Sequence, residues 1–338
     1  MNIHRRTFTK AALSSAATLG LGIGGATAQS QFTFRIGFNV PEAHPITTRI
    51  REASVKIKEE TNGRMELRVF PNNQLGGDTD MLSQVRSGGL EMFMNSGINV
   101  LSTLVPQASI YGLGFIFQNH AAVWKTMDGE LGAYLRAQIL KVGLVPMEKM
   151  WDNGFRNITT STKQINKPAD LKGLKIRVPV GPLFTSVFKS FGAAPASINF
   201  SEIYSALQTR VVDGQENPLA LIYTANLFEV QKYCSLTNHM WDGYFCLANK
   251  RAWEQLPPDI REIMSRHMNN AALAERDDLA KANVSYESQL AAKGLVFNRP
   301  DLTPFKEALR EAGFYREWRA KYGEELWALL EKSVGQLG

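Results

Sequence analysis

Two arginines and one asparagine are the residues of this chain most suited to bind a carboxylate together. Arg156 lies in WDNGFRNITTS, Arg177 lies in LKGLKIRVP, and Asn217 lies in VVDGQENPL. A guanidinium group pairs with a carboxylate through two parallel hydrogen bonds, a geometry that lysine does not reproduce. An asparagine amide adds one donor and one acceptor. These residue types between positions 156 and 217 therefore predict a carboxylate clamp.

The stretch around Arg177 allows two interpretations. Leu174, Ile176 and Val178 alternate with Lys175 and Arg177, which is the period of two of a strand with one apolar and one polar face. Taken alone, this pattern favours a solvated polar face. Each residue of the clamp, however, stands where a predicted strand meets a loop, and ligands of open α/β sheets bind at that edge.

Strand and helix patterns alternate along most of the chain. The first half predicts strands near 32–40, 64–70 and 90–95, with helices near 45–61 and 78–89 between them. This β-α-β-α-β order predicts α/β architecture with mostly parallel strands. A helical pattern then begins at Pro258 and ends at Gly294. The residues between these two positions include no proline or glycine, and the stretch is long enough to span two domains.

The first 28 residues have the composition of an export signal. Arg5, Arg6 and Lys10 precede an apolar stretch at 11–25, and Ala26–Ala28 forms an A-x-A cleavage site. The arginine pair resembles a twin-arginine signal, although ordinary Sec export stays open. We expect cleavage near Ala28 and a periplasmic protein that does not itself span the membrane.

The charge distribution argues against nucleic acid as a partner. The whole chain has 38 Lys and Arg against 32 Asp and Glu, a net charge of +6. Without the three basic residues of the predicted signal the balance is 35 against 32, or +3. The remaining basic residues are mixed with acidic ones, so no basic patch is expected.

No catalytic or metal-binding motif is evident. The five histidines have no metal-ligand spacing, and the common hydrolase, metalloprotease and nucleotide-binding motifs are absent from the predicted mature chain. We therefore expect no metal and no cofactor, with an enzyme acting on a carboxylate as the alternative. Cys234 and Cys246 could form a disulfide after export or stay as two buried thiols.

The motifs resemble those of one protein family along essentially the whole predicted mature chain. PNNQLGGDTDML, LKGLKIRVP and DGQENPL are similar to elements of the DctP family, the solute-binding proteins of TRAP transporters. The resemblance implies that the protein captures a small organic acid and delivers it to the membrane subunits of the transporter. A receptor that presents its ligand to a sensor kinase is a further alternative.

The resemblance also implies a fold and a set of ligand-binding residues. The fold is an α/β, two-domain periplasmic clamshell with crossing strands, a ligand cleft and a long domain-spanning helix. The implied domains are 29–153 plus 243–282, and 154–242 plus 283–338. Arg177 makes the main salt bridge, and the other implied site residues are Arg156, Asn217, Asn39, Asp78, Phe200 and His239.

Three further site residues come from comparing this sequence with that family. Ser96 stands where relatives that take sialic acid have an acidic residue, and Val180 replaces an asparagine after the RVP motif. Both differences remove partners for sugar hydroxyls. Trp151 and Trp241 add aromatic surface near the same loops. Together these residues predict a smaller or less hydroxylated acid, including an aromatic one.

Overall fold

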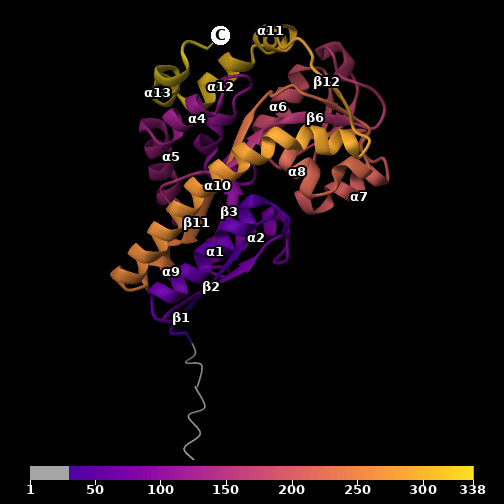
Figure 1. The fold of residues 1–338 in the computed structure, drawn as a ribbon. Helices are drawn as coiled ribbons and strands as arrows, with labels where there is room; N and C mark the ends of the chain where they lie inside the picture. The colour runs from indigo at the N-terminus through magenta and orange to yellow at the C-terminus, as the bar shows by residue number, and fades with distance from the viewer. Residues whose placement is uncertain (1–29, 338) are drawn as a thin grey trace, which may run out of the picture.

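Two mixed β-sheets form the centres of two lobes in the computed structural model, which describes residues 30–337 (Figure 1). The predicted export signal at 1–28 lies outside the described residues. The first sheet has the order β2-β1-β3-β11-β4, with β5 paired to β11, and the second has the order β12-β10-β6-β9-β7-β8. The strands are β1 (Phe32–Gly37), β2 (Met65–Phe70), β3 (Met92–Ser96), β4 (Leu144–Pro146), β5 (Trp151–Phe155), β6 (Asn157–Thr160), β7 (Lys175–Val178), β8 (Ala194–Ser197), β9 (Gly214–Asn217), β10 (Tyr233–Ser235), β11 (Trp241–Asn249) and β12 (Val296–Asn298).

Helices cover the faces of both sheets. The α-helices are α1 (Pro45–Glu60), α2 (Asp78–Ser87), α3 (Leu101–Leu104), α4 (His120–Met127), α5 (Glu130–Lys141), α6 (Pro182–Ser190), α7 (Ile203–Gln208), α8 (Leu219–Thr224), α9 (Lys250–Glu254), α10 (Pro258–Ala292), α11 (Thr303–Glu311), α12 (Phe314–Tyr322) and α13 (Glu324–Val334). Short 3-10 helices are η1 (Pro106–Gly112), η2 (Pro168–Leu171), η3 (Phe200–Glu202) and η4 (Leu227–Glu229). The predicted α/β fold is confirmed.

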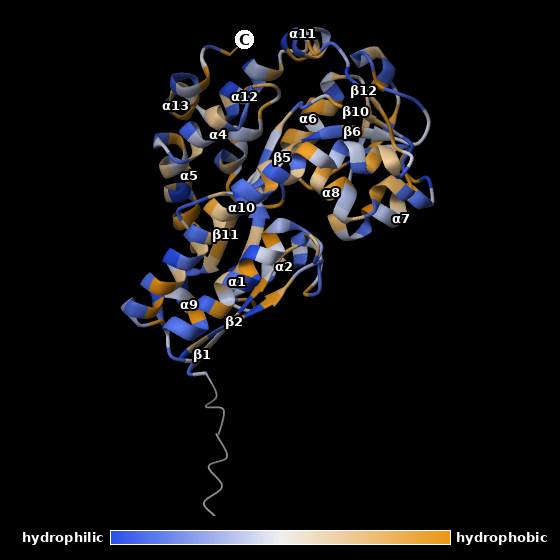
Figure 2. Cartoon of the chain, viewed as in Figure 1, coloured by the Kyte–Doolittle hydropathy of each residue, from blue (hydrophilic) through white to orange (hydrophobic). Residues whose placement is uncertain are grey.

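The predicted β-α-β-α-β start forms the parallel part of the first sheet. Strand β1 pairs in parallel with both β2 and β3, and β11 then joins β3 in the antiparallel direction. Helix α1 buries Ile46, Ile50, Ala53 and Ile57, whose spacing places them on one face. Figure 2 shows the resulting mixture of apolar and hydrophilic residues around α1.

The chain passes between the two sheets at a strand crossover, residues 155–157 and 236–240. Strand β5 of the first sheet leads through Arg156 directly into β6 of the second sheet, and the chain returns from β10 to β11. The two passing segments are hydrogen-bonded to each other. The N–H of Arg156 donates to the Met240 carbonyl at 2.8 Å, and the N–H of His239 donates to the Arg156 carbonyl at 3.2 Å.

The long helix α10 connects the lobes along one side of the molecule. It packs against α1 and β5 and then against α8 of the second lobe, and Figure 1 shows it in orange running between the two. It begins at Pro258 and ends at Ala292, close to the length that the proline- and glycine-free stretch predicted. Glu275 in its buried middle accepts a hydrogen bond from the N–H of Asp152 at 2.9 Å.

The C-terminal helices pack on both parts of the chain. Helices α11 and α12 contact α6, whereas α13 contacts α4 and α5. Trp327 and Leu330 of α13 join the same apolar cluster as Leu131 and Leu135 of α5. The structure therefore places α13 against helices that the predicted boundaries assign to the other domain.

Two features of the sequence concern the environment of the protein. Cys234 and Cys246 are both buried free thiols, so the structure shows no disulfide between them. Among residues 30–337, no helix combines the length and the apolar character that a membrane span requires.

Candidate functional site

A small cavity between the lobes brings the predicted clamp residues together. Arg156, Arg177 and Asn217 all line it, at the ends of strands β5, β7 and β9. Phe200 closes it on the side of the second lobe, and Asn39 contributes from the first. The volume in which the centre of a water-sized sphere can lie is about 10 Å³. One water molecule requires about this much space. The space between the lining side chains is therefore narrow.

Arg177 is a buried cation with an unused hydrogen-bond donor. Its side chain is only 1% exposed, so the interpretation as a solvated strand face is wrong. Its Nε donates to the Ile198 carbonyl at 2.8 Å, and its guanidinium carbon lies 5.9 Å from the centre of the Phe200 ring. Its Nη1 is buried without a partner among residues 30–337. Burial lowers the pKa of Arg177 to about 10, although Glu216 partly counteracts this.

Arg156 is equally buried but fully engaged with protein groups. Its Nε and Nη2 contact the Glu216 carboxylate at 2.5 and 2.8 Å, and its Nη1 contacts Asp242 at 2.5 Å. Nη2 also reaches the side-chain oxygen of Asn217 at 3.1 Å. Burial lowers the pKa of Arg156, but the Glu216 and Asp242 carboxylates outweigh burial and raise it overall. Arg156 therefore organises the cavity wall from both lobes.

Asn217 has partners at both ends of its amide. Its oxygen accepts the bond from Arg156, and its nitrogen donates to the Gln215 side chain at 2.5 Å. Gln215 in turn donates to Thr159 on the neighbouring strand at 2.7 Å. Asn217 is held in place on the cavity wall, and of the three clamp residues Arg177 is the one with a buried, unpaired donor.

The first-lobe wall is a hydrogen-bonded group around Asp242. Ser96 donates to Asp242 at 2.5 Å and Asn153 donates to it at 2.9 Å. The Tyr244 hydroxyl donates to the side-chain oxygen of Asn39 at 3.0 Å. All five residues line the cavity. Ser96 therefore lines the cavity, where it is bonded to an acid that the sequence analysis did not select.

Asp78 lies behind the cavity wall rather than on it. The amide nitrogens of Asn39 and Asn99 both donate to Asp78 Oδ2 at 3.0 Å. Those two asparagines line the cavity, whereas Asp78 does not. Burial raises the pKa of Asp78 despite the two amide donors. Its effect on a ligand would be indirect, through the orientation of the two amides.

Three predicted site residues lie away from the cavity. Trp151 is fully buried in the core, and the Trp241 indole donates to Asp152 at 2.9 Å while its ring packs 5.4 Å from that of Trp124. His239 contacts Glu216 at 3.2 Å, and burial lowers its pKa although Glu216 acts in the opposite direction. His239 therefore acts on Arg156 through their shared partner Glu216.

The placement of the tryptophans removes the basis for the predicted apolar ligand. Neither Trp151 nor Trp241 lines the cavity, and both are buried in the core. Polar groups dominate the wall instead. Besides the residues named above, Asn99 and Asn153 contribute amides. The lining offers more partners for hydroxyl groups than Ser96 and Val180 alone had indicated.

Sequence reasoning missed the acids of the site. Glu216 stands inside the motif DGQENPL, directly before Asn217, and is fully buried. Asp242 is the second residue of β11 and is 2% exposed. The available signal was the strand period of two: Asp242 faces the cavity, and its neighbour Trp241 faces the core.

Comparisons with known proteins match this chain to bacterial solute-binding proteins. The family model described as "Bacterial extracellular solute-binding protein, family 7" matches residues 36–319. The 2,3-diketo-L-gulonate-binding periplasmic protein YiaO of Escherichia coli K12 is 32% identical, over 82% of this chain and 84% of the relative. The C4-dicarboxylate-binding periplasmic protein DctP of Rhodobacter capsulatus is 33% identical, over 82% of this chain and 79% of the relative.

Solved structures show the same fold. A TRAP periplasmic solute-binding protein from Sulfurospirillum deleyianum with bound succinate is 30% identical, with a TM-score of 0.84 over 90% of this chain and 99% of that chain. The sugar acid binding protein from Advenella mimigardefordensis in complex with galactonate is 28% identical, with a TM-score of 0.85 over 90% and 98%. With the family model covering most of its length, this chain belongs to the DctP family of bacterial extracellular solute-binding proteins, family 7.

Proposed function

We propose that this protein is the periplasmic receptor of a TRAP transporter, which binds an organic acid between its lobes and delivers it to the membrane subunits. The observation that carries the proposal is the unpaired Nη1 of Arg177 at the narrow cavity between the lobes. A buried cation with an unused donor is costly unless an anion completes its hydrogen bonds. A ligand carboxylate supplies that anion.

The charges of the site favour a monocarboxylate. Arg156 is already paired with Glu216 and Asp242, which leaves Arg177 as the cation available to a ligand within the cavity wall. A second carboxylate on the ligand would approach those buried acids without a cation of its own. Two carboxylates that share one cation repel each other, so a dicarboxylate is disfavoured.

The lining also favours hydroxyl groups on the ligand. Asn39, Asn99 and Asn153 present amides, and Tyr244 presents a hydroxyl, around the same space. These groups can replace the water bonds that a polyhydroxylated acid loses on burial, at about 1 kcal/mol for each bond made. Solved relatives contain bound galactonate and D-erythronate, both hydroxylated monocarboxylates. We therefore place hydroxylated monocarboxylates ahead of aromatic acids.

Binding requires the lobes to move apart and close again. The cavity of about 10 Å³ has no room for an organic acid as it stands. Its wall comes from both sheets, and the covalent links between the sheets include the two strands of the crossover. A ligand that contacts both lobes favours the closed arrangement by the affinity difference between the open and closed forms.

Calorimetric titration tests the binding role. Purified protein without its predicted signal would be titrated with galactonate, D-erythronate, succinate and benzoate, and each acid would be recovered and examined by mass spectrometry. We expect one of the hydroxylated monocarboxylates to bind most tightly and to be recovered unchanged. Steady turnover would contradict the receptor and favour the enzyme alternative.

Arg177→Lys tests the contact itself. Lysine keeps the charge but loses the planar pair of donors, so we expect a loss of about 1.5–3 kcal/mol in binding. Arg68→Lys is the matched control, since Arg68 lies on the exposed side of β2 with 58% of its side chain accessible. Equal affinity of Arg177→Lys and the wild-type protein would remove Arg177 from the site.

Delivery to membrane subunits needs a separate experiment. Vesicles containing the membrane subunits of a candidate TRAP transporter would be supplied with labelled ligand. Uptake that depends on added receptor supports transport. Binding of the loaded receptor to a sensor kinase, with no effect on uptake, would instead support the signalling alternative.

A further inference from the structure

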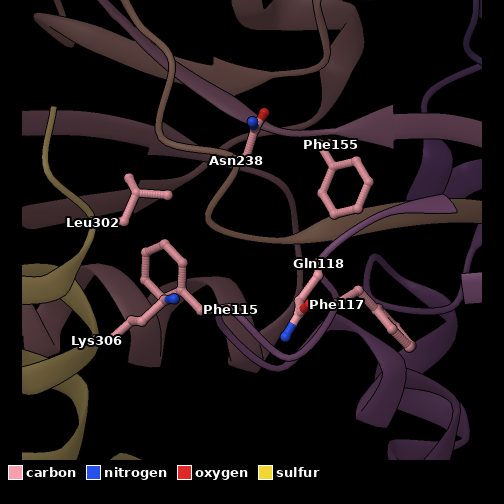
Figure 3. A pocket seen from close by; sticks show the side chains of 7 residues that line it. All are labelled: Phe115, Phe117, Gln118, Phe155, Asn238, Leu302 and Lys306. Atoms are coloured by element: carbon pink, nitrogen blue, oxygen red, sulfur yellow. The ribbon is translucent and has the colours of Figure 1, made fainter. Parts of the chain in front are cut away.

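A second pocket lies at the strand crossover and shares no lining residue with the carboxylate cavity. Its volume is about 270 Å³, and Figure 3 shows the labelled side chains arranged around it. Phe155 is the last residue of β5 and directly precedes Arg156 of the carboxylate cavity. Successive residues of an extended chain point to opposite sides. The pocket and the cavity therefore lie on opposite sides of the same crossover segment.

The walls of the pocket are apolar and come from distant parts of the chain. Phe115 and Phe117 belong to the segment before α4, and Leu302 directly precedes α11. Phe115, Phe155 and Leu302 are only partly buried, so they present apolar surface to the pocket and to solvent. Concave apolar surface of this kind is typical of ligand sites.

Two of the lining residues have an uncommon backbone conformation. Phe115 has φ of 60° and Asn238 has φ of 41°, in the left-handed region that a bulky residue such as phenylalanine rarely adopts. The N–H of Phe115 donates to the His239 carbonyl at 2.8 Å, and the Gly114 carbonyl accepts from the Tyr315 hydroxyl at 2.8 Å. These bonds hold the Phe115 side chain at the pocket. Such strain concentrates at functional sites.

Polar groups at the pocket indicate the charge of its ligand. Lys306 of α11 extends toward the other labelled side chains in Figure 3 and makes no salt bridge within residues 30–337. Gln118 and Asn238 add exposed amides that can donate to an anion. None of the pocket's lining residues is acidic. We propose that this pocket is a second ligand site, which takes a small apolar carboxylate with its ring or branched body against the phenylalanines and its carboxylate toward Lys306.

Fluorine NMR with 4-fluorobenzoate tests this site. The titration would use Arg177→Gln protein, which silences the carboxylate cavity, so any binding reports another site. Leu302→Trp fills the pocket with a larger side chain, and Lys306→Gln removes the cation. Arg310→Gln is the control for Lys306→Gln, since it removes another exposed cation from the same helix α11.

The proposal predicts a definite pattern among these variants. 4-Fluorobenzoate should bind Arg177→Gln protein at millimolar concentration, with at least tenfold weaker binding when Leu302→Trp is added. Lys306→Gln should weaken binding about two- to fivefold, the range expected for an exposed ion pair, and Arg310→Gln should not. 4-Fluorobenzyl alcohol should bind with no dependence on Lys306.

Two results would overturn the second site. One is loss of 4-fluorobenzoate binding in Arg177→Gln alone, which would mean that the carboxylate cavity is the binding place. The other is unchanged binding when Leu302→Trp and Lys306→Gln are combined in the Arg177→Gln background. Both results leave the proposed receptor function untouched, since that function rests on Arg177.

Discussion

Arg156 and Arg177 are buried to the same degree but differ in how many partners the protein provides for their guanidinium groups. Their exposures are 2% and 1%, and both line the cavity between the lobes. Arg156 contacts two carboxylates, whereas the Arg177 side chain donates from Nε to the Ile198 carbonyl and has no partner for Nη1 within residues 30–337. The pKa values follow the partners, since that of Arg156 is raised and that of Arg177 is lowered.

This difference separates a structural role from a binding role for one residue type. The partners of Arg156 come from β9 and β11, so its ion pairs tie together strands of the two sheets. Arg177 instead has a hydrogen-bond donor without a partner. This unpaired donor lowers the stability of the folded protein, and a bound anion would offset the loss. Equal burial therefore does not imply an equal function.

The largest effect is expected from Arg156→Met. Removal of this guanidinium leaves Glu216 and Asp242 buried without their cation, which typically costs about 3–5 kcal/mol. The free energy of unfolding from urea titration measures the loss. Arg51→Met is a suitable control, because Arg51 pairs with Glu42 on the exposed surface and such pairs contribute at most about 1 kcal/mol. Equal losses in the two variants would contradict the structural role of Arg156.

A smaller loss is expected from Asp242→Asn. The substitution keeps the size of the side chain but removes one of the two charges that face Arg156. It weakens the charged hydrogen bonds from Arg156, Ser96 and Asn153, so we expect a loss of about 1.5–3 kcal/mol in unfolding free energy. Adding Ser96→Ala to this variant should cost less than Ser96→Ala alone, since the two residues interact directly. Full additivity would mean that Ser96 and Asp242 are not coupled.

The smallest effect concerns a buried base outside the cavity. His44 caps α1, its Nδ1 accepts from the Ile46 N–H at 3.2 Å, and its Nε2 is buried without a partner among the described residues. Burial lowers the pKa of His44 to about 3. Between that value and the ordinary histidine value near 6.5, the unfolded chain binds a proton that the folded protein does not.

Stability should therefore fall as the pH drops below about 6.5, by up to about 1.4 kcal/mol per pH unit from His44. The slope of unfolding free energy between pH 6.5 and 5 measures this contribution. His44→Asn keeps a capping side chain and should flatten the slope, whereas His267→Asn, at a partly exposed position on α10, is the control. An unchanged slope in His44→Asn would contradict the contribution assigned to His44.

Much of the architecture followed from local sequence patterns. The strand around Ile176, the parallel start of the first sheet and the long helix α10 each depend on the periodicity of neighbouring residues, which a single sequence contains. Local sequence patterns do not show that Arg156 and Arg177 have different roles. The acids that engage Arg156 lie 60 and 86 positions away from it, so their contact exists only in the folded chain.

The errors in the predicted site have a similar origin. Trp151 and Trp241 stand next to loops of the site, but the chain turns both rings into the core. In contrast, Asn153 and Asp242, one or two positions away, face the cavity. Alternation of strand side chains separates Trp241 from Asp242. It does not separate Trp151 from Asn153, which are two positions apart. There the pairing of β5 with β11 is irregular, and only the folded chain shows which side chain faces the cavity.

Unfolding of Arg177→Met, with and without ligand, tests the central claim most directly. Methionine fills much of the same space without a charge. Because the unpaired cation is gone, the free energy of unfolding of the ligand-free variant should lie within about 1 kcal/mol of the wild-type value or above it. The stabilisation by the tightest-binding acid of the titration panel, about 2.7 kcal/mol at a hundredfold excess over Kd for the wild-type protein, should disappear. A ligand-free loss as large as that of Arg156→Met, or ligand stabilisation that persists, would contradict the assignment of Arg177 to the ligand.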